Sequence, residues 1–234
     1  MIDTAVLLAA GEGSRLRGSA PSKPLCPVAG RPLIDHALTG LAATGIRRAV
    51  VVVGYERERI ERYLASWDWP LSVETVVTDH RQPNGVSALA AAPVVGDRPT
   101  LLAMCDHLVV PALYARVAAA GAGDGLTLGI DRRLDHDWVD PEDVTRVKTD
   151  GDRIVALGKM MDDYDAHDTG VFAVGPALFA SLATLPEPSL TEGVRILAAR
   201  SEARAVDCSD LDWIDVDDAP ALAKAEAWLG AVAA

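Results

Sequence analysis

Short apolar runs alternate with segments of helical spacing, and this alternation constrains the fold more than any other feature of the sequence. Thr4 to Ala10 is continuously apolar and ends at a glycine turn, which is typical of a strand buried on both faces of a parallel sheet. Apolar residues then recur at helical spacing from Leu33 to Ala42, and Thr44-Gly45 follows as a stop. Ala49 to Val53 is a second buried run. The pattern predicts βαβ units.

The rest of the chain extends this pattern and then changes it. We expect a helix over 57–64, a strand over 73–77, a helix over 86–92 and a strand over 100–105. Beyond residue 120 we expect strands over 126–130, 170–174 and 203–207, a hairpin formed by 144–148 and 153–157, and a closing helix over 219–232. The prediction is one domain, residues 1–234, with a Rossmann-like open, mixed and mostly parallel α/β sheet and helices on both faces.

Charge and cysteine usage restrict the class of partner. The formal net charge is −12, which argues against a protein that coats nucleic acid or an anionic membrane. The three cysteines are far apart and lack paired spacing, so we expect neither a disulfide framework nor a zinc site. We find no basic leader and no apolar stretch long enough to cross a bilayer, so the sequence favours a cytoplasmic protein. Whether the chain forms a homodimer stays open.

A glycine loop follows the first predicted strand, at the edge of an α/β sheet where ligands gather. Gly11 and Gly13 lack Cβ atoms, so their backbone N–H groups can approach a polyphosphate, and Arg15 adds a fixed charge. The predicted anion cradle consists of Leu8, Ala9, Ala10, Gly11, Glu12, Gly13 and Ser14. Taken alone, Gly-x-Gly could equally be a simple turn.

The surroundings of this loop weaken two other phosphate-binding folds. A dinucleotide fold needs a third glycine where Leu16 stands, and an acidic residue at the end of the second strand, where the chain reads Val53-Gly54-Tyr55. The Gly-Lys-Ser/Thr ending of a P-loop is also missing. Lys23 follows the loop in a chain with only four lysines, and its ammonium can act as a compact charge for phosphate.

The combined pattern resembles the sugar-phosphate nucleotidyltransferases. The residues that carry the likeness are Leu8-Ala9-Ala10-Gly11-x-Gly13-Ser14-Arg15-Leu16, then Lys23-Pro24-Leu25 and Gly30-x-Pro32-Leu33-Ile34. Four further segments are similar to the inositol-1-phosphate cytidylyltransferases: Asn84 to Ser87, Met104 to Leu108, Gly129 to Arg133 and Trp213 to Asp217. Gly158-Lys159 and Asp168 to Phe172 extend the resemblance over most of the chain. The chain departs from the pattern at Cys105 and at Asp218-Ala219.

The resemblance implies a nucleotide-diphospho-sugar transferase fold with a nucleotide-binding half, 1–120, and an acceptor-binding half, 121–234. The implied reaction transfers CMP from CTP to inositol 1-phosphate and releases pyrophosphate. Because the second pKa of a phosphate is ~6, the attacking phosphate needs no general base, and charge neutralisation and alignment should dominate catalysis. We therefore expect Arg15, Lys23 and Lys159 to act as catalytic cations, with Lys159 assigned by the resemblance.

Magnesium is the expected cofactor, held by carboxylates. Asp106 ends a predicted strand at the carboxyl edge of the sheet and is our first ligand, since magnesium takes one or two carboxylates with phosphate oxygens and water. The resemblance supplies Asp215 as the second ligand, with Asp217 as an alternative. We interpret His107 as structural, because magnesium prefers oxygen ligands.

The remaining site residues also come from the resemblance. Asn84, Gly85 and Ser87 are implied near the base and ribose, and Asp168, Thr169 and Gly170 on the acceptor side. Asp131 could accept hydrogen bonds from acceptor hydroxyls or could simply pair with Arg132 or Arg133. Two alternatives stay open: a nucleotidyltransferase for another acceptor, such as a sugar phosphate or phosphocholine, and a nucleotide-binding regulatory module without turnover.

Overall fold

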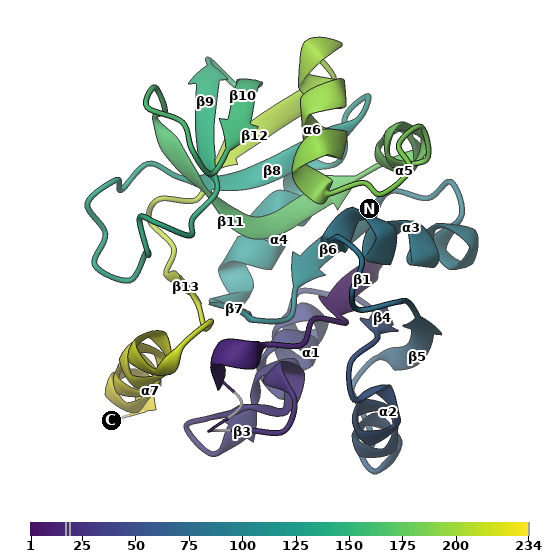
Figure 1. Cartoon of the computed structure of the whole chain (residues 1–234), viewed down its shortest axis with the longest axis vertical. Helices are drawn as coiled ribbons and strands as arrows, with labels where there is room; N and C mark the ends of the chain where they lie inside the picture. The colour runs from purple at the N-terminus through teal and green to yellow at the C-terminus, as the bar shows by residue number, and fades with distance from the viewer. Residues whose placement is uncertain (17, 19, 234) are drawn as a thin grey trace.

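The computed structural model describes residues 1–16, 18 and 20–233. Over these residues a main sheet of nine strands runs in the order β5-β4-β1-β6-β11-β8-β12-β10-β9 (Figure 1). Two small sheets, β13-β7 and β2-β3, flank it. The strands are β1 (Thr4–Ala9), β2 (Pro27–Val28), β3 (Arg31–Pro32), β4 (Arg48–Val53), β5 (Ser72–Val77), β6 (Thr100–Met104), β7 (His107–Val109), β8 (Leu126–Asp131), β9 (Arg146–Asp150), β10 (Arg153–Gly158), β11 (Ala166–Val174), β12 (Ala203–Asp207) and β13 (Trp213–Asp215).

The helices confirm the expected layers on both faces of the sheet. They are α1 (Leu33–Ala43), α2 (Arg57–Ala65), α3 (Asn84–Val95), α4 (Pro111–Ala120), α5 (Pro176–Leu182), α6 (Leu190–Ala199) and α7 (Ala219–Ala233), with 3-10 turns η1 (Ser14–Leu16) and η2 (Lys23–Leu25). Side chains of α1, α2 and α4 pack in one apolar cluster, and those of α3, α5 and α6 in another. None of the helices in the described ranges is both long and apolar enough to cross a membrane.

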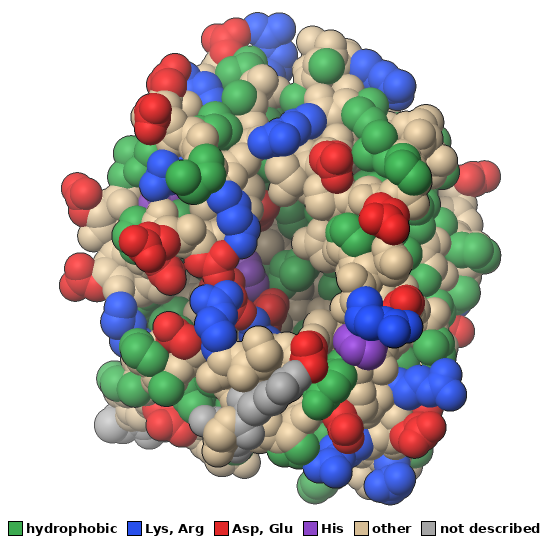
Figure 2. Space-filling model, in the orientation of Figure 1, with side chains coloured by type: hydrophobic (Ala, Val, Ile, Leu, Met, Phe, Trp, Pro, Cys, Tyr) green, Lys and Arg blue, Asp and Glu red, His purple; other side chains and the backbone are tan. Residues whose placement is uncertain are grey.

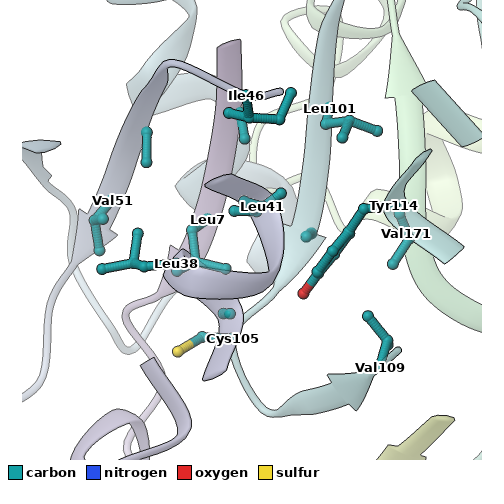
Figure 3. Close-up of a cluster of buried hydrophobic side chains, with 14 of the residues drawn as sticks. Leu7, Leu38, Leu41, Ile46, Val51, Leu101, Cys105, Val109, Tyr114 and Val171 are labelled. Atoms are coloured by element: carbon teal, nitrogen blue, oxygen red, sulfur yellow. The ribbon is translucent and has the colours of Figure 1, made fainter. Parts of the chain in front are cut away.

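The first strands show why the alternating pattern gives two cores. In β1, Leu7 faces the cluster of α1 and α4, whereas Val6 and Leu8 face that of α3. All six residues of β1 are buried, as expected for a central strand covered by helices on both faces. Figure 3 shows the α1 and α4 side of this core, where Leu7, Leu38 and Leu41 gather near Tyr114.

The direction of the strands explains where the site lies. β5, β4, β1 and β6 are neighbours and run parallel, so their carboxyl ends lie along one edge. β11 is antiparallel to β6 and β8, while β10 is antiparallel to β12 and β9. Because β8 and β12 are parallel, the strands that run against the rest of the described sheet are β10 and β11. The expected mixed, mostly parallel sheet is therefore confirmed, and it continues through both predicted halves.

Candidate active site

Lys23 and the predicted metal ligands meet at the carboxyl edge of the parallel strands. The Lys23 Nζ lies 2.6 Å from Asp106 Oδ2 and 3.8 Å from Asp215 Oδ1, and it also contacts Asp217. Lys23 is only 8% exposed, so its charge is almost entirely compensated by these acids rather than by water. Burial alone would lower the pKa of Lys23, but Asp106 and Asp215 outweigh it and raise that pKa. The structure thus brings together three residues that are distant in sequence.

A two-stranded sheet places Asp215 beside Asp106. β7 continues from the end of β6 and pairs antiparallel with β13, so that Asp215 lies opposite His107. The next residue, Val216, donates its backbone N–H to the carbonyl of Asp106 at 3.0 Å. The short β7–β13 pair therefore fixes the carboxylates relative to one another.

The two acids fit a divalent cation. The Oδ1 atoms of both Asp106 and Asp215 are buried and have no hydrogen-bond partner among the described residues. Ligand atoms of Asp106, His107 and Asp215 lie within 4.8 Å of one another. Unpaired buried carboxylate oxygens are costly unless a cation or donor meets them, and oxygen is the donor that magnesium prefers. The fit supports the predicted magnesium site but leaves the identity of the ion as a proposal.

His107 acts here as a charged neighbour of the carboxylates. Its Nδ1 lies 2.8 Å from the Thr169 carbonyl, its Nε2 lies 3.4 Å from Asp215 Oδ2, and its ring stacks on Trp213 at 5.7 Å. Burial would lower the pKa of His107, yet Asp215 and further partners raise it to about 9. The imidazole is held between the Thr169 carbonyl, Asp215 and the Trp213 ring, and these contacts fit the structural role expected from the sequence.

The glycine loop lies next to Lys23 and contains two glycines with different surroundings. Gly13 has φ +58°, and a Cβ there would lie 2.3 Å from the Cβ of Lys23. Gly11 has no such neighbour within 4 Å of an added Cβ, so its surroundings are open. Tyr55 donates its N–H to the Ala10 carbonyl at 3.0 Å, which anchors the start of the loop. Gly13 thus serves the packing of Lys23, while Gly11 leaves room for a ligand at the strand end.

Arg15 and Lys159 converge on an acid that the sequence analysis did not identify. The Arg15 guanidinium lies 2.6 Å from Asp143 Oδ2 and 2.7 Å from Asp217 Oδ2, and Lys159 contacts the other oxygen of Asp143. Hydrogen bonds from Arg15 and then Lys159 lower the pKa of Asp143 to about 2. Two expected catalytic cations, one from each half of the chain, therefore share one carboxylate.

A cavity of about 550 Å³ lies beside these charges. Figure 2 shows a hollow on this face, where acidic, basic and histidine side chains meet. Predicted residues on its wall include Asn84, Asp106, Lys159, Asp168, Gly170 and Asp215. Its other walls come mainly from a loop before β9 and from the start of α7, through Asp137, Trp138, Asp143, Ala221 and Lys224. The volume suits a small phosphorylated molecule.

The Asn84–Ser87 segment reaches this cavity only through Asn84. Its Oδ1 accepts the Leu190 N–H at 2.9 Å, so it also ties α3 to the start of α6. A Cβ on Gly85 would lie 2.5 Å from the Pro188 carbonyl oxygen, so this glycine permits contact with the protein's own backbone. Ser87 is buried in α3. The predicted nucleotide contacts of Gly85 and Ser87 are therefore not brought to the cavity.

Asp131 and Asp168, the two acids expected on the acceptor side, have different surroundings. Asp131 is fully buried, pairs with Arg133 and accepts a hydrogen bond from the Trp213 indole at 2.8 Å. Asp131 therefore forms the ion pair with Arg133 that was one of its two expected roles, although it is buried and not exposed, and its carboxylate does not reach the cavity. Asp168, by contrast, lines the cavity and accepts the Gly170 N–H at 2.7 Å.

Thr169 and Gly170 shape the wall around His107. The Thr169 hydroxyl donates to the Gly129 carbonyl at 2.7 Å, so the side chain points away from the cavity into the sheet. Gly170 has φ +75°, and a Cβ there would lie 2.3 Å from Nδ1 of His107. These two residues position the histidine, whereas Asp168 faces the open space.

Comparisons with known proteins were consistent with this geometry. A model of the MobA-like NTP transferase domain matches residues 5–203. A bifunctional IPC transferase and DIPP synthase of Rubrobacter xylanophilus is 34% identical over 91% of this chain and 49% of its own. A CMP-5'-(3-aminopropyl)phosphonate synthase of Streptomyces rubellomurinus is 33% identical over 92% of this chain and 37% of its own. The chain spans about half the length, or less, of these curated relatives.

A solved structure shows the same fold. The inositol-1-phosphate CTP transferase from T. maritima superposes with a TM-score of 0.84, at 23% identity, over 96% of each chain. Its likeness confirms the expected nucleotide-diphospho-sugar transferase fold, and the relatives above confirm the expected family resemblance.

Proposed function

We propose that this chain, which belongs to the MobA-like NTP transferase family, transfers CMP from CTP to inositol 1-phosphate and releases pyrophosphate with CDP-inositol. The observation that carries the proposal is the convergence of Lys23, Asp106 and Asp215 next to the glycine loop and a cavity. The IPC transferase and DIPP synthases of Rubrobacter xylanophilus and of Aquifex aeolicus, at 34% and 29% identity, support this choice of substrates.

The residues offer charge neutralisation and alignment, which is what this reaction requires. A phosphate nucleophile already carries nearly two negative charges, so repulsion between two anions is the main obstacle. Lys23 would neutralise a phosphate that approaches the carboxylates, and Arg15 and Lys159, which both contact Asp143, would add positive charge from the two halves. The cations hold the reacting groups in line, and none of them needs to remove a proton.

Magnesium would be held by Asp106 and Asp215, each of which has a buried Oδ1 atom without a hydrogen-bond partner among the described residues. When bound, the ion would neutralise phosphate oxygens as a Lewis acid. Asp217 contacts both Lys23 and Arg15, so we assign it to the positioning of these cations. We likewise propose a reducing, cytoplasmic setting, because all three cysteines are free and buried.

A second acceptor class is supported by one observation. The cavity wall carries the acids Asp137, Asp140, Asp143, Asp168 and Asp218, besides the predicted metal ligands. Such a wall would attract an amine more readily than a neutral polyol, and one relative is a synthase of a CMP-aminoalkylphosphonate. An aminoalkyl phosphonate, or phosphocholine, is therefore the second candidate acceptor.

A pyrophosphate-release assay separates these functions. The purified protein is incubated with Mg²⁺, each nucleoside triphosphate in turn, and a panel of inositol 1-phosphate, 3-aminopropylphosphonate, phosphocholine and sugar phosphates. We expect release with CTP and inositol 1-phosphate above every other pair. Release with another acceptor only would replace the narrow assignment, whereas tight CTP binding without release on any acceptor would indicate a non-catalytic module.

A further inference from the structure

Asp143 joins two proposed catalytic cations that come from different halves of the chain. Arg15 belongs to the glycine loop in the nucleotide-binding half, and Lys159 follows β10 in the acceptor-binding half. Both reach the same carboxylate, one on each oxygen. Asp143 itself lies in the loop before β9 and faces the cavity.

The carboxylate of Asp143 is less exposed to solvent than its two partners. The side chain of Asp143 is 25% exposed, whereas those of Arg15 and Lys159 are 53% and 56% exposed. Without Asp143, Lys159 would lose the carboxylate that it contacts, and Arg15 would keep only its contact with Asp217, so both long side chains could turn toward an incoming phosphate at lower cost. With Asp143 present, each cation must first leave a charge-assisted hydrogen bond.

The Arg15–Asp143–Lys159 bridge forms one end of a chain of alternating charges. From the acceptor side it runs through Lys159, Asp143, Arg15 and Asp217 to Lys23, which contacts Asp106. A carboxylate with a cation on each oxygen has the charge pattern of a bound phosphate. Asp143 therefore offers both cations the kind of partner that a substrate phosphate would offer.

We infer that Asp143 is a positioning residue that takes the place of substrate phosphate at Arg15 and Lys159 and competes with phosphate for both cations. This inference rests on the proposed function, in which Arg15 and Lys159 neutralise substrate phosphate. Each cation is held by its own oxygen of Asp143, so a phosphate that binds to either cation must replace a charge-assisted hydrogen bond.

Calorimetric titration of the intact protein with simple anions tests the inference without requiring turnover. Pyrophosphate probes the Arg15 side and inorganic phosphate the Lys159 side, and Arg15→Gln and Lys159→Gln variants verify that each probe depends on its own cation. In Asp143→Asn we expect each anion alone to bind roughly three- to tenfold more tightly, because the competing charge is gone.

Asp137→Asn is the matched control. It removes the same charge from the same loop and cavity wall, but Asp137 meets Lys224 through its main-chain oxygen. We expect its effects on both anions to be clearly smaller than those of Asp143→Asn. Asp143→Ser provides a second variant and should shift binding in the same direction as Asp143→Asn.

Two results would overturn the inference: unchanged or weaker binding of the single anions in both Asp143 variants, or an equal effect in Asp137→Asn. Because the anions bind without reaction, failure here is separable from failure of the pyrophosphate-release assay. A protein that shows the expected shifts but does not use CTP and inositol 1-phosphate would retain this device for other phosphorylated substrates.

Discussion

The Nζ atom of Lys23 is the point at which three acids of the site meet. Its Nζ contacts Asp106 and Asp217 and lies 3.8 Å from Asp215. Replacing it with glutamine keeps much of the side-chain volume but removes the charge that the developing phosphate negative charge requires. We expect Lys23→Gln to lower kcat by about 10²- to 10³-fold, in the range of losing one electrostatic contact in a transition state.

Steady-state pyrophosphate release measures this effect, and Lys148→Gln is the control. Lys148 is a lysine of β9 that pairs with Asp163, and neither residue lies on the cavity wall. Its replacement should leave kcat within about twofold, as expected for a solvated ion pair. A Lys23→Gln enzyme that kept more than a tenth of the wild-type kcat would contradict the assigned role.

Asp168 makes the stability of the fold depend on pH. Burial raises the pKa of Asp168 from its ordinary 3.8 to about 6, against the opposing effect of the Gly170 N–H. Between these two values the folded protein binds a proton that the unfolded chain has released, so the free energy of unfolding decreases as the pH rises through this window. At about 1.4 kcal/mol per pKa unit, the loss is about 3 kcal/mol.

Urea unfolding of the wild type and Asp168→Asn from pH 4 to pH 7 checks this sign. The asparagine carbonyl can still accept the Gly170 N–H but cannot ionise. The wild type should therefore lose stability relative to the variant as the pH rises to 6, and the difference should then remain constant. A constant difference across the whole range would show that Asp168 titrates normally.

At this scale the sequence predicts which residue types bear the chemistry better than it predicts their partners. Arg15, Lys23, Asp106, Asp215 and Lys159 were selected from the glycine loop, strand ends and resemblance, and the structure gathers them. Asp143 was missed, because an acid among Asp135, Asp137, Asp140 and Glu142 has no local feature that distinguishes it. The role of Asp131 stayed open in the sequence because one of its partners, Trp213, is far away in sequence.

At the scale of elements, the fold of the loop after β1 requires glycine at position 13 but not at position 11. Gly13 has φ +58°, and an added Cβ would collide with Lys23, whereas an added Cβ on Gly11 would meet open space. Without ligand, we expect Gly13→Ala to destabilise the fold by about 1 to 3 kcal/mol through strain and displacement of Lys23. Gly11→Ala should change stability by less than about 1 kcal/mol.

Denaturant unfolding of both variants without nucleotide provides the measurement. Equal stability of the two would mean that the loop rearranges freely around Lys23. The comparison is sharp because both substitutions add one methyl group to the same loop.

The elements that formed as expected are those with strong local periodicity. The expected strand over 203–207 has the same bounds as β12, and the expected strand over 49–53 differs from β4 by one residue. β7 and β13 were not predicted, since three-residue strands show no period and pair only across long sequence separation. α6 was missed although a capping box, with Ser189 and Glu192, marks its start.

At the scale of the whole molecule, the site depends on the meeting of the two halves. β11, from the second half, pairs antiparallel with β6, from the first, and this continues the sheet into the second half. β13 returns late in the chain to pair with β7, which carries Asp215 to Asp106. The order of strands could be anticipated only in the first half, where each βα unit lies beside a unit near it in sequence. The placement of β8 and β12 beyond β11 follows from long-range pairing that no local pattern encodes.

A crystal structure of the protein with CTP and Mg²⁺ tests the central claim most directly. The account predicts a metal ion bound by Asp106 and Asp215, a triphosphate against the backbone of residues 11–13, and Lys23 moved from the carboxylates to a phosphate oxygen. Phosphates bound away from the glycine loop, or Asp106 and Asp215 too far apart to share one ion, would contradict it.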